Sequence, residues 1–71
     1  MKRVEYRVHF GDWESTDSHD FDIVHHSQWH KWIDYEDQKR RVVWIERFEE
    51  HYTSFGEPHI FYDDILWEVE E

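Results

Sequence analysis

The sequence predicts a small α+β domain in which an antiparallel sheet packs against one short helix, in the order ββαββ. Three observations predict it. Apolar and polar residues alternate near both ends of the chain, helical spacing replaces the alternation near residue 30, and breaks in the pattern separate the segments. A chain of 71 residues is long enough for a single domain, 1–71, and contains no internal repeat, linker or low-complexity segment.

Two strands are expected in the first third of the chain. Residues 3–10 alternate over four periods, which is typical of a half-buried strand. Its apolar members are Val4, Tyr6, Val8 and Phe10. Residues 11–20 are polar and have the composition of a loop or a long hairpin turn. Phe21 and Ile23 then alternate with aspartates, which predicts a second strand.

A short helix is expected over residues 28–37. Ser27 is a favourable N-cap residue, and Trp29, Trp32 and Ile33 follow at a spacing that places them on one helical face. Three cations at 39–41 suit the C-terminal end of a helix, where the backbone carbonyls carry partial negative charge.

Residues 41–52 fit two structures. Val42, Ile45, Phe48 and Tyr52 would line one face of a helix, but the dense β-branched and aromatic run at 42–45 favours a strand. A break is expected at 53–58, which contains a glycine and a proline. Residues 59–69 alternate again with one change of phase, which predicts a final strand with a β-bulge at Asp63 and Asp64.

The aromatic content exceeds what the core of so short a chain needs. Five Trp, five Phe and four Tyr are present, and each ring can bury roughly 150–250 Å². We therefore expect a second apolar surface, which is either a homodimer seam or part of a partner site. Trp13 lies in the acidic loop and either anchors a partner's arginine or folds back onto the sheet. The remaining tryptophans are expected in the core: Trp29, Trp32, Trp44 and Trp67.

The charge balance excludes several classes of function. Binding to nucleic acid or to anionic lipid requires positive charge, whereas the formal net charge of this chain is −10. Neither is therefore expected as its main activity. No run of residues is apolar enough for a membrane span or a signal peptide, and there is no cysteine. These features favour a soluble protein of a reducing cytoplasm.

The acidic residues gather in two segments. Residues 12–22 and 57–71 contain no Lys or Arg, and together they hold most of the carboxylates. Carboxylates two residues apart on a strand lie about 6.6 Å apart on one face, so a row of them can imitate the phosphates of a duplex. The alternative is that the acids only keep an aromatic-rich domain in solution. The predicted partner-binding residues are Asp12, Glu14, Asp17, Asp20, Asp22, Asp63, Asp64, Glu68, Glu70 and Glu71.

No catalytic, metal or cofactor site is predicted. His26 and His30 have a spacing that can bind zinc, but no cysteine joins them, and exposed histidines explain the pair better. Ser27 beside His26 lacks the geometry of a nucleophile and its base, and no glycine-rich phosphate loop is present. We therefore expect a binding protein and not an enzyme.

In overall character the chain resembles the DNA-mimic inhibitors that bacteriophages make early in infection, closest to the phage inhibitor of the bacterial nucleoid protein HU. The features that carry the resemblance are the short length, the acidic and aromatic composition, the absence of cysteine and the segregated carboxylates. The resemblance implies a homodimer that occupies the DNA-binding cleft of a basic host protein in the host cytoplasm. The alternative is an inhibitor or adaptor whose aromatic surface binds a non-DNA-binding partner such as RNA polymerase.

Overall fold

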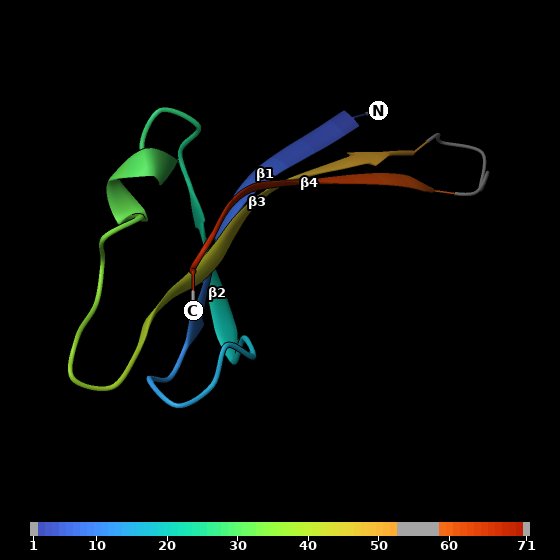
Figure 1. The fold of residues 1–71 in the computed structure, drawn as a ribbon. Coiled ribbons are helices and arrows are strands. Elements are labelled where there is room, and N and C mark those ends of the chain that lie inside the picture. Colours follow the sequence, from blue (N-terminus) through green and yellow to red (C-terminus); the bar gives the residue numbers. More distant parts are fainter. Residues whose placement is uncertain (1, 53–58, 71) are drawn as a thin grey trace.

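The structure, a computed structural model, describes residues 2–52 and 59–70 as one antiparallel sheet with a single turn of 3-10 helix (Figure 1). The strands run antiparallel in the spatial order β2-β1-β3-β4. The two long strands β1 and β3 therefore lie in the centre, and β2 and β4 form the edges. The elements are β1 (Lys2–Gly11), β2 (Asp20–Val24), η1 (Trp29–Trp32), β3 (Arg41–His51) and β4 (Ile60–Glu68).

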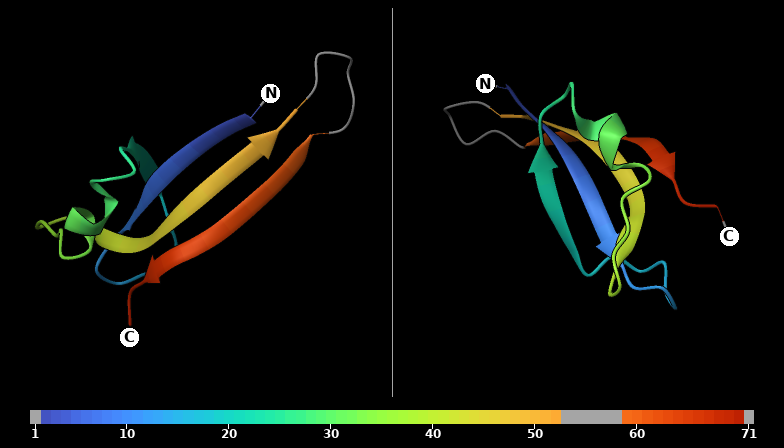
Figure 2. Two further views of the ribbon diagram at one scale, coloured as in Figure 1. Left: turned by 90° about the horizontal axis from the view of Figure 1, so that it is seen from above. Right: turned by 90° about the vertical axis from the view of Figure 1, so that its left-hand side faces the viewer.

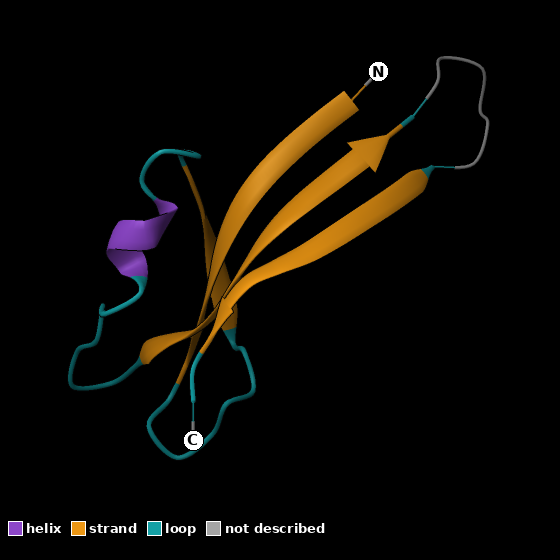
Figure 3. Cartoon of the chain, turned by 45° about the horizontal axis from the view of Figure 1, so that its top comes forward, coloured by secondary structure: helices purple, strands orange, loops and turns teal. Residues whose placement is uncertain are grey.

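The chain measures 46 × 24 × 17 Å along its principal axes. Its sheet is long and twisted (Figure 2). It divides into two halves. The core half consists of residues 8–11, 41–45 and 66–68 together with η1, which lies over one face. The arm consists of residues 2–7, 46–51 and 60–65, and Figure 3 shows it projecting away from η1.

The hydrophobic core lies in the core half, on the face that η1 covers. Alternate residues of a strand point to opposite faces, so the apolar positions of β1 and β3 meet side by side on this face. Its fully buried members are Val8, Phe10, Val42 and Ile45. The partly buried residues packed against them come from every other element and its flanks: Val24, Trp29, Trp32, Ile33, Leu66 and Trp67.

The prediction of a helix over 28–37, and with it of a ββαββ fold, is wrong. The chain forms only the four-residue 3-10 turn η1, and its backbone hydrogen bonds span three residues, as from Lys31 N–H to the Gln28 carbonyl. The Ser27 hydroxyl lies 2.7 Å from a ring nitrogen of His25 and caps no helix. The Asp37 carboxylate accepts hydrogen bonds from the N–H groups of residues 39 and 40, which closes a turn into β3.

The strand over 41–52 is confirmed as β3, and the other three expected strands are also present. The bulge lies elsewhere than predicted. Asp63 and Asp64 pair in register with Phe48 and Arg47, and the shift falls where Leu66 is inserted opposite the Ile45–Glu46 step. The expected break at 53–58 lies outside the described residues.

Candidate acidic interface

The fold brings the two acidic segments to one end of the sheet. Gly11, the last residue of β1, pairs with the first residue of β3, and β3 in turn pairs with the end of β4 through Trp44 and Glu68. The β1–β2 connection and the C-terminal residues consequently lie close together (Figure 1). Thr16, Glu68 and Val69 line one open hollow of about 490 Å³. We call this region, with residues Asp12, Glu14, Asp17, Glu68 and Glu70, the acidic end.

Gly11 allows the acidic loop to fold against the sheet. A Cβ at this position would lie 2.9 Å from the Asp17 carbonyl oxygen and 2.9 Å from Val43 Cγ1, which is closer than real Cβ atoms approach. Local hydrogen bonds then shape the loop. The Asp12 carboxylate accepts from the Glu14 N–H, and the Ser15 hydroxyl accepts from the Asp17 N–H, as is usual for these residues in turns.

Four residues of the acidic end are exposed: Glu14, Asp17, Glu68 and Glu70. Among residues 2–52 and 59–70, Lys and Arg form no ion pair with Glu14, Asp17, Glu68 or Glu70. Within the same described ranges, Asp12 pairs with a histidine, His19, at 3.3 Å. The acidic end therefore presents free negative charge to solvent.

The remaining predicted residues lie in other places. Asp20 is bound by Arg40 at 2.7 Å, which neutralises it. Asp22 lies on β2, at the opposite edge of the sheet from β4, where Asp63 and Asp64 lie within the arm. Glu71 falls outside the described residues. The structure thus brings together half of the predicted set and separates the others.

In the arm, in contrast, the strand pair β1–β3 neutralises its own charges. Glu49 accepts a hydrogen bond from His51 and also contacts Lys2 and Arg47; although partial burial opposes the shift, these contacts lower the pKa of Glu49 to about 2. Four cations of the arm have carboxylate partners there. The pairs are Lys2–Glu49 at 3.1 Å, Arg3–Glu50 at 3.5 Å, Arg7–Glu5 at 2.8 Å and Arg47–Glu49 at 3.2 Å. The excess negative charge of the described chain therefore falls largely outside the arm's strand pair β1–β3.

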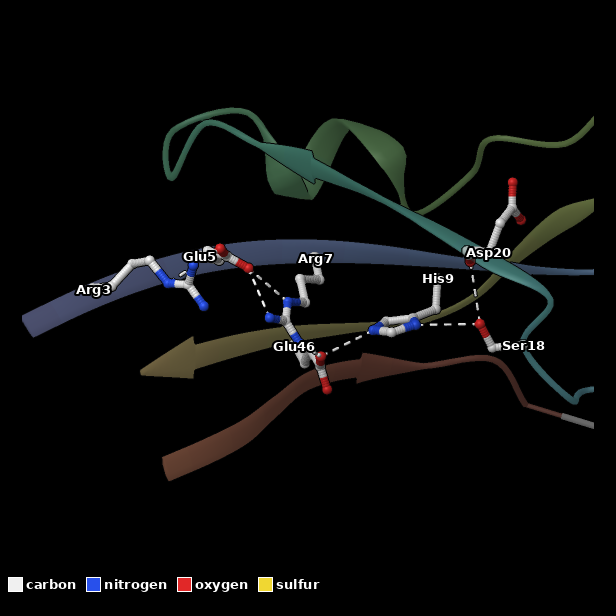
Figure 4. A network of polar contacts seen from close by, with 7 residues as sticks. All are labelled: Arg3, Glu5, Arg7, His9, Ser18, Asp20 and Glu46. Carbon is white, nitrogen blue, oxygen red and sulfur yellow. Dashed lines mark hydrogen bonds and ion pairs between the residues drawn. The ribbon is translucent and has the colours of Figure 1, made fainter. Parts of the chain in front are cut away.

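A buried polar cluster that the sequence analysis did not predict lies between the two halves (Figure 4). His9 Nε2 lies 3.0 Å from Glu46 Oε1, and His9 Nδ1 lies 3.2 Å from the Ser18 hydroxyl. The imidazole stacks on Trp44, with 4.3 Å between the ring centres. The only sequence signal was an acid, Glu46, inside an apolar strand. Its partner could not be inferred because their pairing depends on the register of β1 against β3.

The electrostatics of this cluster couple two carboxyl groups. Burial alone would raise the pKa of Glu46, but hydrogen bonds with His9 and Asp63, together with the charge of Arg7, lower it overall. Partial burial, followed by the hydrogen bond and the charge of Glu46, raises the pKa of Asp63. The two pKa values are therefore shifted in opposite directions, and the Glu46 carboxylate contacts His9 and Arg7.

The contacts of Ser18, His9 and Glu46 resemble a serine–histidine–acid arrangement, but they fix the loop and do not activate the serine. The Ser18 hydroxyl donates to the Asp20 carbonyl oxygen at 3.1 Å. Nucleophilic catalysis requires the hydroxyl proton to be directed to a base, whereas the proton of Ser18 is directed to a carbonyl oxygen. The cluster ties the β1–β2 connection to β3, and so positions the acidic end.

Trp13 folds back onto the protein. Its indole N–H donates to the Asp37 carbonyl oxygen at 2.9 Å, and Arg41 lies over its ring at 5.3 Å. The ring is still 46% exposed. Of the tryptophans expected in the core, Trp29, Trp32 and Trp67 pack there, whereas Trp44 lies on the opposite face of the sheet with His9.

No family model, curated protein or solved structure matches this chain. Within the described residues, no helix has the length and apolar character that a membrane crossing requires. The function is therefore inferred from the charge and the geometry of the acidic end.

Proposed function

We propose that the protein binds a basic nucleic-acid-binding protein through its acidic end and inhibits it by occupying the surface that binds DNA. The nucleoid protein HU in the cytoplasm of a bacterial host is the partner that the resemblance implies. The protein acts by binding alone and needs no cofactor.

One observation carries the proposal. The acidic end joins carboxylates from two segments that lie about fifty residues apart in the sequence, and Glu14, Asp17, Glu68 and Glu70 have no Lys or Arg partner among the described residues. Free charges of one sign that converge on one region attract a surface of the opposite sign and accelerate the encounter. A surface that binds phosphates carries such an array of Lys and Arg.

The test is competition with DNA. HU is mixed with a short labelled duplex, and the protein is titrated in at low and at moderate salt. Because binding between charged surfaces weakens with ionic strength, we expect displacement of the duplex at low salt and much weaker displacement at moderate salt. Failure to displace the duplex and to bind HU at low salt would contradict the proposal for this partner.

Two variants of equal net charge locate the site. The first, Asp17→Asn with Glu68→Gln, removes two free charges from the acidic end. The second, Asp22→Asn with Asp34→Asn, removes two exposed charges from elsewhere. We expect the first to weaken binding about tenfold or more and the second to weaken it much less. Equal losses would show that only total charge matters.

A second candidate function is binding through an apolar surface to a partner that does not bind DNA. The observation in its favour is the run of exposed large side chains at the edge of the sheet, Ile60, Phe61, Tyr62 and Ile65. Affinity that hardly changes with salt would favour this function over mimicry.

A further inference from the structure

The outer edge of β4 is open for pairing with another strand. In the described chain β4 pairs on one side with β3 and lies at the end of the sheet order, so its other side has no strand neighbour. It is nine residues long, whereas the opposite edge strand β2 has five. An exposed edge presents a row of backbone N–H and C=O groups that another extended chain can pair with.

Both faces of β4 combine apolar side chains with an aspartate. On one face, Phe61, Asp63 and Ile65 follow one another at every second position, and Phe61 packs on Phe48 with 5.6 Å between ring centres. On the other face lie Tyr62 and Asp64. Phe61 and Tyr62 are 54% and 52% exposed, although most large rings in a folded domain are covered.

Asp63 and Asp64 are consecutive residues at the middle of β4, and Asp63 also forms a hydrogen bond with Glu46. Neither forms an ion pair with a Lys or Arg among the residues that the structure describes. Arg47 lies directly opposite Asp64 in the strand register, but its guanidinium is directed to the Tyr6 hydroxyl and to Glu49. The centre of the edge therefore holds two adjacent acids, one on each face.

A second copy of this chain is a poor occupant of the edge. Antiparallel pairing of β4 with itself about its central residue would place the Asp64 carboxylates of the two copies directly opposite each other. Like charges opposite each other destabilise a strand pair. Asp63 and Asp64 favour an incoming strand with cations at the corresponding positions, so they select against one partner and for another.

We propose that β4 takes up an extended segment of the basic partner as a fifth strand of the sheet. The segment carries two consecutive cations, which face Asp63 and Asp64, and apolar residues on either side, which cover Phe61, Tyr62 and Ile65. The inference rests on the proposed function because it takes the partner to be basic. It adds that a strand of this partner pairs with the edge of β4. Recognition of this kind takes affinity from main-chain hydrogen bonds and specificity from the side chains.

The experiment uses the full chain and a nine-residue synthetic peptide, the length of β4, with a central Lys-Arg pair between Val and Thr residues. NMR chemical shifts of the backbone amides report where the peptide binds. We expect the largest changes in residues 60–68 and in the facing part of β3. Changes confined to the acidic end, or no changes at all, would overturn the inference.

Two controls separate strand addition from simple charge attraction. A peptide with the same side chains but N-methylated at alternate residues keeps both charges and loses main-chain donors, and we expect it to bind about tenfold more weakly or worse. Asp63→Asn with Asp64→Asn should weaken the unmodified peptide by a similar factor. An N-methylated peptide that binds as well as its parent would contradict strand addition.

The outcome is independent of the test of the proposed function. If HU is displaced from DNA by the protein and the peptide does not bind β4, the proposed function stands and the fifth strand is excluded. If the peptide binds β4 and Asp17→Asn with Glu68→Gln leaves the displacement of DNA unchanged, the partner is held at β4 and the acidic end is not the site.

Discussion

The core half and the arm are held together by different forces. In the core half, four fully buried apolar side chains lie beneath η1 and its flanks. In the arm, the same strands continue without such a cover, and ion pairs join β1 to β3: Lys2–Glu49, Arg3–Glu50 and Arg7–Glu46. The comparison shows that a chain too short to build a core along its full length can extend a sheet beyond the core with cross-strand charge pairs.

The difference also decides where charge is free. The arm places its acids opposite its cations, so its strands β1 and β3 are close to neutral. The core half is stabilised by apolar burial and does not need its acids for internal pairing, which leaves those of the acidic end available to a partner. In the core half, therefore, apolar burial stabilises the fold and the acids of the acidic end remain free.

The largest effect should come from the core half. Phe10 is fully buried, touches Trp32 and Tyr35 edge-on, and lies under the Arg40 guanidinium at 4.0 Å. We expect Phe10→Ala to lose about 3–5 kcal/mol of unfolding free energy, enough to leave much of the chain unfolded. Urea denaturation followed by tryptophan fluorescence measures the loss.

The matched change in the arm is Phe48→Ala. Phe48 is half-buried and stacks on Arg7 at 4.0 Å, so the expected loss is smaller, about 1–2 kcal/mol. Equal losses for Phe10→Ala and Phe48→Ala would break the distinction between the two halves.

An intermediate effect is expected at the boundary between the halves. Glu46 accepts from the buried His9 and lies 3.6 Å from the partly buried Arg7, so Glu46→Ala leaves His9 without its carboxylate and leaves Arg7 with Glu5 alone. The expected loss is about 2–3 kcal/mol in urea denaturation. Glu46→Gln keeps an oxygen that can accept from His9 and should lose about half as much. If Glu46→Ala costs no more than a surface substitution, the cluster does not join the two halves.

The strands were predictable because their signal is local. One face of β1 is turned to the core and the other to the His9 cluster, so apolar and polar residues alternate along its sequence. The run at 42–45 was assigned correctly to a strand because β-branched and aromatic side chains crowd a helix.

The helix was not predictable by spacing alone. Trp29 and Trp32 are three residues apart. Both an α-helix and a 3-10 turn place residues at this spacing on one side, so the spacing does not distinguish the two structures. The side chains that could cap a helix make other hydrogen bonds. The Ser27 hydroxyl contacts the His25 ring, and the Asp37 carboxylate accepts from two N–H groups of the following turn. Those choices depend on tertiary context.

The site was half predictable for a similar reason. Counting charges locates the acidic segments, and it identifies Asp17 and Glu68 equally well. It cannot show that Arg40 neutralises Asp20 across twenty residues, or that inserting Leu66 places both Leu66 and Trp67 against the core and leaves Ile65 exposed on the other face. Pairing and register are properties of the sheet and not of any one segment.

The smallest effect, and the one that most sharpens the comparison, is the pH dependence of the arm. The pKa of Glu49 is about 2 in the folded protein against an ordinary value of 4.5, chiefly because of the hydrogen bond from His51. A carboxyl whose pKa is lowered by folding stabilises the fold above its unfolded pKa, and this contribution is lost as the pH falls. The window therefore runs from about pH 4.5 down to about pH 2.

We expect Glu49→Gln to flatten the pH dependence of unfolding in this window, with an effect that shrinks as salt is added, because exposed ion pairs are screened. Urea midpoints at several pH values, at low and at high salt, measure it. If the wild type and Glu49→Gln keep parallel pH profiles, the ion pairs around Glu49 do not stabilise the arm.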